Sequence, residues 1–200
     1  MLRAFHPTKR ALTETVMVLM ETKAPNQITT EEILEKSGIS KGSMYHHFAD
    51  LDDLIETALL ARYAKWIDAS IEFMYKNVLP AKSKDELRAA LFKLTELTQI
   101  DSRKAARAER ALALSMCNTN LRMAERMGEE TKRLTAAIAD ITEEVRNKGF
   151  LKPTVDSKTL ATFIQAYTLG KIVNDHNPDG VAEEQWVNFI MEIAESAWLN

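Results

Sequence analysis

Apolar side chains recur every three or four positions along most of the chain, and this spacing is that of one face of an α-helix. Between residues 8 and 22, for example, Leu12, Val16 and Leu19 fall on one stripe. No segment shows the sustained alternation of apolar and polar residues, bounded by turn residues, that is typical of a β-strand. The pattern therefore predicts an all-α fold.

The same spacing divides the rest of the chain into further helices. Pro80 must end one long helix, because proline interrupts the hydrogen bonds of a helix interior. Asn147, Lys148 and Gly149 form a stop signal for another. The helices expected after residue 50 cover residues 55–73, 84–98, 102–117, 123–145, 157–173 and 183–198, and the clearest loop is 174–180.

Composition limits the class of protein. Of 200 residues, 46% are apolar and 28% are charged, which is typical of a globular protein with one substantial core or two small ones. The single cysteine, Cys117, excludes an internal disulfide and a cysteine-based zinc cluster. The N-terminus lacks the apolar run of a signal peptide, and no run of about 18 apolar residues predicts a membrane span. We therefore expect a cytoplasmic protein without a membrane partner.

A short helix with a marked beginning and end is predicted at residues 29–37. Residues 29–32 fit a capping box, in which Thr29 caps the free N–H groups and Glu32 reaches back to it. Gly38 follows, and glycine most readily takes the positive φ that ends a helix. The sequence thus predicts a helix that stops at a tight turn.

A second short helix is predicted at residues 41–48, with Ser40 as its cap. Met44 and Phe48 lie four positions apart and are expected to pack inward, which leaves polar and cationic residues on the outer face. Two short helices joined by a glycine-containing turn are the description of a helix-turn-helix, whose second helix enters the major groove of DNA.

The residues of this turn and second helix resemble the signature of the TetR family of repressors. Residues 38–48 read Gly-Ile-Ser-Lys-Gly-Ser-Met-Tyr-His-His-Phe. The family has glycine, a hydrophobic residue, Ser-Lys-Gly-Thr-Leu-Tyr, any residue and His-Phe, so this chain differs at Ser43 and Met44. The resemblance implies a three-helix DNA-binding domain at residues 1–50 and a helical ligand-binding and dimerisation domain at residues 51–200.

The resemblance also implies how the chain meets double-stranded DNA. Two residues would face the major groove, a glycine would allow close approach, and three residues would contact the phosphate backbone. In this order the implied DNA-binding residues are Lys41, Ser43, Gly42, Tyr45, His47 and Thr30. Hydroxyl, amide and cationic groups suit phosphate, whereas contacts with base edges give sequence specificity.

Charge gives no independent sign of a nucleic-acid partner. The net charge is −3, and residues 1–60 alone hold six Lys and Arg against nine Asp and Glu, whereas DNA-binding domains are expected to be basic. Many TetR-family members also have a basic residue where Glu31 stands and a lysine where Leu51 stands. We therefore predict weaker electrostatic binding to DNA, and a shallower dependence of affinity on salt, than is typical of the family.

The resemblance further implies that the chain is a homodimer. The last two long helices would pair across a twofold axis into a four-helix bundle, and two recognition helices would then read a palindromic operator. The sequence permits this pairing, because both helices have an apolar stripe and small residues that allow close approach. These small residues are Ala161, Ala166, Gly170, Ala194 and Ala197.

An unidentified small-molecule effector is the last implied partner, held inside the larger domain. The candidate ligand-binding residues are apolar or aromatic side chains on its central helices: Tyr63, Trp66, Phe92, Met116, Cys117, Met123 and Tyr167. The alternative for each is a place in the core, because aromatic and methionine side chains at helical spacing usually pack there. Arg107 and Arg110 could meet an anionic ligand, but the exposed face of a charged helix is the favoured place for both.

Other classes of protein are less favoured. No Glu-x-x-His metal motif, activated cysteine or phosphate loop suggests an enzyme. No cofactor or metal is predicted, because the adjacent His46 and His47 would point about 100° apart on a helix. A helix-turn-helix also occurs as a structural corner. The main alternative is a helical protein-interaction module that has lost sequence-specific DNA binding, which the acidic N-terminal segment favours.

Overall fold

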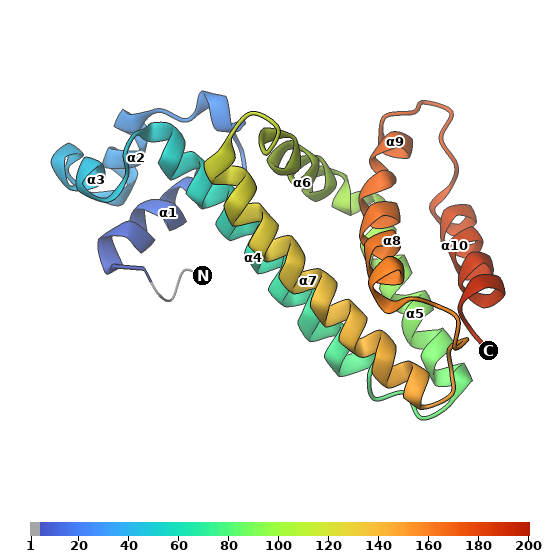
Figure 1. Ribbon diagram of the computed structural model, residues 1–200. Helices are drawn as coiled ribbons and strands as arrows, with labels where there is room; N and C mark the ends of the chain where they lie inside the picture. Colours follow the sequence, from blue (N-terminus) through green and yellow to red (C-terminus); the bar gives the residue numbers. More distant parts are fainter. Residues whose placement is uncertain (1–4) are drawn as a thin grey trace.

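The computed structural model describes residues 5–200, and every regular element in that range is a helix. Figure 1 shows a small head formed by α1 to α3 and a larger body, joined by two long helices, α4 and α7, that lie side by side. The all-α prediction is confirmed. No helix between residues 5 and 200 has both the length and the apolarity that crossing a bilayer requires.

The helices begin and end close to the positions that periodicity predicts. In the head they are α1 (Pro7–Leu19), α2 (Thr30–Ser37) and α3 (Lys41–His47), with a short 3-10 turn η2 (Pro25–Gln27) between the first two. The others are α4 (Leu51–Asn77), α5 (Lys84–Gln99), η3 (Asp101–Arg103), α6 (Lys104–Met116), α7 (Leu121–Asn147), α8 (Ser157–Gly170), α9 (Ile172–Asp175) and α10 (Glu183–Ala197).

The turn between α2 and α3 has the predicted geometry. Thr29 Oγ1 accepts a hydrogen bond from the N–H of Glu32, and Ser40 Oγ accepts one from the N–H of Ser43. Gly38 ends α2 with a φ of 67°. The second half of the capping box is wrong, because both Glu32 carboxylate oxygens lie 2.9 Å from Lys23 Nζ. The full positive charge of the Lys23 ammonium attracts the Glu32 carboxylate more strongly than a backbone N–H does.

Gly38 provides the first test of this turn. Because an L-residue with a side chain is strained in the left-handed region, Gly38→Ala should lower the free energy of unfolding by about 1–2 kcal/mol. Gly42, inside α3, has ordinary helical φ and open space for a Cβ, so Gly42→Ala should raise it by about 0.5 kcal/mol. Urea denaturation of the DNA-free protein measures both values. Equal effects of the two substitutions would contradict the turn geometry.

Ion pairs and a hydrogen bond fasten the start of α4 to the start of α7. Glu56 is buried in α4, and its carboxylate accepts hydrogen bonds from Asn120 Nδ2 at 2.5 Å and Arg122 Nε at 2.8 Å. Asp53, one turn earlier, accepts from the N–H of Ala49 at 3.2 Å and lies 3.4 Å from the Arg126 guanidinium. The segment that follows α3 is therefore tied to the larger body as well as to the head.

A cation lies inside the body, which corrects one prediction. Arg107 is fully buried in α6, whereas the sequence predicts an exposed helix face. Its guanidinium donates to Asp175 of α9 at 2.5 and 2.6 Å and to the carbonyl oxygens of Thr98 and Ile100. The prediction was wrong because the carboxylate that neutralises Arg107 lies in a distant segment, and periodicity within one helix contains no information about it.

Candidate nucleic-acid interface

The predicted DNA-binding residues lie together on the outer side of α3 and at the start of α2. Lys41, Gly42 and Tyr45 are exposed, and the Tyr45 residue keeps 45% of its surface accessible. Ser43, His47 and Thr30 are half-buried. Met44 and Phe48 are buried against α1 as predicted. The inward packing of α3 thus leaves a continuous polar face on its other side.

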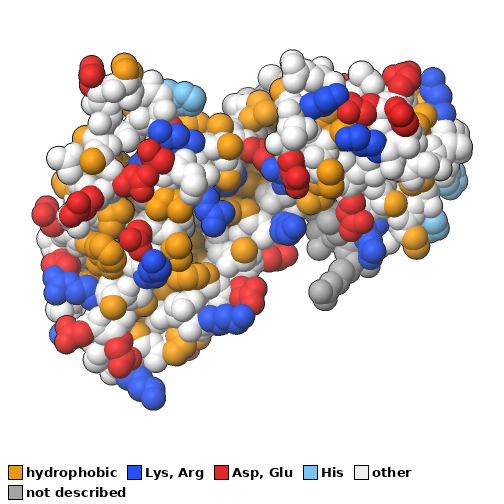
Figure 2. All heavy atoms as spheres, turned by 180° about the vertical axis from the view of Figure 1, so that it is seen from behind, with side chains coloured by type: hydrophobic (Ala, Val, Ile, Leu, Met, Phe, Trp, Pro, Cys, Tyr) orange, Lys and Arg blue, Asp and Glu red, His pale blue; other side chains and the backbone are white. Residues whose placement is uncertain are grey.

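Two histidines of α3 and the histidine that precedes α1 meet at the end of this face. The His6 ring, which precedes α1, stacks on the His47 ring with 4.8 Å between centroids, and the His46 ring lies edge-on to His47 at 5.1 Å. Lys9 Nζ lies 4.9 Å from the centroid of the Phe48 ring. Figure 2 shows histidines at the tip of the head, in the right half of that view.

This cluster changes the protonation of His47. Partial burial of the ring, followed by the like charges of His6, His46 and Lys9, lowers the pKa of His47 below its usual range.

His6 is not among the site residues that the sequence predicts, although its place directly before Pro7 marks the start of a helix. Between residues 5 and 200 no three His, Cys, Asp or Glu side chains come close enough to hold a metal ion.

The start of α2 is acidic. Glu31 and Glu32 occupy its first turn, and Lys23 neutralises only Glu32. The positive end of a helix dipole favours an anion, but a negative side chain at the same place weakens that attraction. Glu31 is exposed, so it would lie near a phosphate contacted by Thr30.

The candidate effector residues are distributed over several cavities. Tyr63 and Trp66 line a cavity of about 290 Å³ between α4, α6, α7 and α8, together with the polar Thr131, Thr135 and Gln165. Tyr167 lines a separate cavity of about 80 Å³ with apolar walls, formed by α4, α5, α7, α8 and α10. Phe92 lies in an open groove between α5 and α10.

Three of these residues line none of the cavities just described. Met123 is fully buried in the core, and Met116 and Cys117 are half-buried at the end of α6. Cys117 Sγ lies 3.6 Å from the Ala113 carbonyl oxygen, and burial raises the pKa of this thiol. A raised pKa keeps the thiol protonated, which disfavours nucleophilic chemistry at Cys117.

Apolar side chains remain exposed on the last helices. Phe163 of α8 keeps 39% of its surface accessible, Phe189 of α10 keeps 53%, and Val173 of α9 keeps 77%. The small residues differ in position: Ala166, Gly170 and Ala197 are exposed, whereas Ala161 and Ala194 are buried within the chain. Figure 2 shows hydrophobic side chains gathered over the larger body, among charged ones.

Comparison with known protein families finds a match over the head. Residues 12–58 match the pattern that defines the tetR family of bacterial regulatory proteins. This match covers α2, α3 and the turn between them, together with most of α1 and the first turns of α4. No curated protein is similar enough in sequence to count as a match.

Solved structures share the fold over nearly the whole chain. A structure described as a TetR-family transcriptional regulator from Mesorhizobium loti has a TM-score of 0.73 at 15% identity, covering 96% of this chain and 97% of that one. A transcriptional regulator from Saccharomonospora viridis, in complex with choline, has a TM-score of 0.71 at 16% identity, covering 96% and 97%. Reduced NemR of E. coli has a TM-score of 0.69 at 16% identity, covering 93% and 97%. At these identities the likeness shows the fold.

Proposed function

We infer that this chain, a TetR-family regulator by its N-terminal domain and its fold, is a repressor that binds a palindromic operator as a homodimer and releases it when an effector binds. The observation that carries this proposal is the polar outer face of α3, held by the buried Met44 and Phe48 within a segment that matches the family. Lys41 and Ser43 would contact base edges, and Thr30, Tyr45 and His47 would contact phosphates.

The exposed apolar side chains of α8 and α10 support the homodimer. Phe163 and Phe189 lie on helices whose opposite faces pack against α7 and α5, so a second copy could cover their outer faces. Gly170, exposed at the end of α8, would let a partner helix approach closely. Two heads related by a twofold axis would read half-sites separated by one turn of DNA or a multiple of it, about 34–36 Å for one turn.

The cavity between α4, α6, α7 and α8 supports the response to an effector. Its Tyr63 and Trp66 belong to α4, the helix that also continues from the head. A ligand shifts the operator-bound state only if it binds one position of the head more tightly than the other. A ligand that contacts α4 would bind with different affinity to the two positions of the head, because α4 moves with the head.

Selection of bound fragments from genomic DNA tests the proposal. We expect purified protein, unfolded and refolded to remove any bound ligand, to enrich one palindromic site at low salt. The salt dependence of its affinity should be shallow, because Glu31 and Leu51 supply no cation to the phosphates. No enrichment at low salt would instead favour the protein-interaction module. A species of 22.6 kDa that persists at micromolar concentration would exclude the homodimer.

The histidine cluster predicts a dependence of operator affinity on pH. His47 has a lowered pKa in the free protein and is therefore mostly neutral at pH 7. A phosphate beside the ring would favour the protonated form, so DNA binding would take up a proton and affinity should rise as the pH falls from 8 to 6. Fluorescence anisotropy with labelled operator measures this rise.

Two glutamine variants separate His47 from general effects of acid. His47→Gln should remove most of the pH dependence, whereas His176→Gln should preserve it, because His176 lies in the exposed loop after α9. If both variants follow the wild-type curve, His47 does not contact the phosphates.

A further inference from the structure

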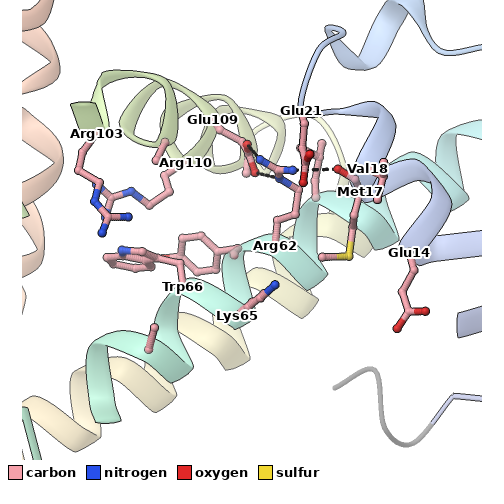
Figure 3. Close-up of a pocket in the computed structure, with 15 residues that line it drawn as sticks. Glu14, Met17, Val18, Glu21, Arg62, Lys65, Trp66, Arg103, Glu109 and Arg110 are labelled. Carbon is pink, nitrogen blue, oxygen red and sulfur yellow. Dashed lines mark hydrogen bonds and ion pairs between the residues drawn. The ribbon is translucent and has the colours of Figure 1, made fainter. Parts of the chain in front are cut away.

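A cavity of about 510 Å³ lies where the head meets the body, next to the cavity assigned above to the effector, with which it shares Tyr63, Trp66 and Arg110. Figure 3 shows its walls: α1 on one side, α4 below and α6 above. This volume falls within the range of about 300–1,000 Å³ that is typical of small-molecule sites. The cavity therefore has room for a ligand that touches both parts of the molecule.

Arg110 is the most unusual residue of this cavity. Its guanidinium carbon lies over the Trp66 ring, 4.1 Å from the ring centroid, in a cation–π contact. The Arg110 Nε atom is buried, and no acceptor for it exists among the described residues. Burial, with the like charges of Arg107 and Arg103, lowers the pKa of Arg110 to about 10, and nearby Tyr63 only partly opposes this. Arg110 as a whole is half-buried, so its buried Nε–H lacks an acceptor that an anion entering the cavity could supply.

The other charged groups give the cavity two unlike ends. Arg62 is already satisfied, because it donates to Glu109 at 2.6 and 2.7 Å and to the Met17 carbonyl oxygen at 2.9 Å. Arg103, the last residue of η3 before α6, points toward Arg110 and Trp66, as Figure 3 shows, and Lys65 projects from α4. Among the described residues none of Arg103, Arg110 and Lys65 forms an ion pair.

Acidic side chains occupy the opposite end, on α1. Glu14 is paired with Arg10 at 3.3 Å, and Glu21 lies at the rim of the cavity near α1. An anion is therefore attracted to the α6 end and repelled from the α1 end. The wall between the two ends includes Leu59, Ala69, Ala106 and Ala113, which offer an apolar surface.

We propose that this cavity binds a small organic anion, whose carboxylate or sulfonate is held by Arg110 and Arg103 and whose apolar ring system packs between Trp66 and α1. The planar guanidinium suits such a group, because its N–H donors lie in one plane and can contact two oxygens at once. Among the described residues Arg110 contacts the Trp66 ring and has no partner for its buried Nε–H, so a ligand in the cavity could accept from the guanidinium.

Such a ligand would also act on the head. Its apolar part would contact Met17 and Val18 of α1, while its anionic group is held by α6 of the body. The ligand would thus prefer the position of the head that keeps these two walls at the right separation. This regulatory consequence rests on the proposed function; the binding of the anion does not.

A pair of matched probes tests the site without DNA. One probe is 8-anilinonaphthalene-1-sulfonate, and the other is N-phenyl-1-naphthylamine, which has the same rings and no sulfonate. We expect the wild-type protein to bind the sulfonate at least about tenfold more tightly than the neutral probe, the effect of one or two charge-assisted hydrogen bonds. Arg110→Gln should abolish this preference, and Arg110→Lys should retain part of it.

Further variants keep the test informative. Arg103→Gln changes an exposed side chain, so it should fold normally and reduce the preference for the sulfonate even if Arg110→Gln proves unstable. Arg88→Gln is the control, because Arg88 pairs with Glu195 in the distant groove between α5 and α10. The proposal is overturned if both probes bind the wild type equally, or if the sulfonate binds Arg103→Gln and Arg110→Gln as it binds the wild type.

These results are independent of operator binding. Selective binding of the sulfonate by a protein that enriches no DNA would support the anion site and contradict the regulator. Enrichment of an operator by a protein with no preference for the sulfonate would support the regulator and contradict the anion site.

Discussion

Replacing Arg107 with methionine should lower the free energy of unfolding by about 3–5 kcal/mol, the effect of removing one partner from a buried ion pair. The substitution would leave the Asp175 carboxylate almost fully buried without its cation, and it would remove the donors to the carbonyl oxygens of Thr98 and Ile100. Urea denaturation at pH 7 measures the loss. Lys104→Met is the matched control, because Lys104 is an exposed neighbour in α6, and its effect should stay within about 0.5 kcal/mol.

The loss should depend on pH in a defined direction. Arg107 holds the pKa of Asp175 below its usual range in the folded protein. The stability contributed by this pair is therefore complete above the pKa of the unfolded carboxyl, near 4, and is lost as the pH falls through the lower folded pKa. The difference between wild type and Arg107→Met should be largest at pH 7 and should shrink toward pH 3. A difference that is constant over this range would show that packing, rather than charge, causes the loss.

The double variant Lys41→Ala/Tyr45→Phe should bind the selected operator about 100-fold more weakly than the wild type. Loss of a base contact is worth about 1–3 kcal/mol and loss of a phosphate hydrogen bond about 1 kcal/mol, which together correspond to roughly two powers of ten. Both side chains are exposed and contribute little to the core. The thermal unfolding curve should therefore remain close to that of the wild type, while anisotropy with labelled operator shows the weaker binding.

A control substitution on the buried side of α3 distinguishes the loss of DNA contacts from the loss of folding stability. Met44→Ala empties a buried position of α3, and it should weaken DNA binding only together with a loss of stability of about 2–5 kcal/mol. If Lys41→Ala/Tyr45→Phe binds DNA like the wild type, the exposed face of α3 does not read the operator. The protein-interaction module would then become the better explanation of that face.

The parts of the fold that sequence could predict depend on neighbouring residues. Helix α5 was expected at residues 84–98 and runs from Lys84 to Gln99, because apolar periodicity and the flanking Pro80 are local signals. The turn after α2 was predicted for the same reason, since Gly38 and Ser40 act on backbone groups within a few residues of themselves. The division into domains at residue 50 stays a prediction, and α4 begins directly after it.

The parts that sequence could not predict depend on distant partners. Arg107 and Arg110 occupy one charged helix, and only the fold shows that Asp175 neutralises the first while the second lies over the Trp66 ring. The exposed face expected for this helix was therefore wrong at Arg107, which is fully buried, whereas Arg110 is half-buried. The assignment of effector residues has the same weakness, because aromatic side chains such as Tyr63 and Tyr167 line different cavities.

The length of α4 converts a small tilt at one end of the helix into a large displacement at the other. It has 27 residues, which at the rise of an α-helix gives a rod about 40 Å long. A tilt of only about 5° at one end of such a rod displaces the other end by about 3.5 Å, more than the length of a hydrogen bond. The pairing of Glu56 with Arg122 and Asn120 would carry the start of α7 along with it. In a dimer, opposite displacements of two heads would add, so a movement too small to disturb either core would put both recognition helices out of step with the DNA grooves.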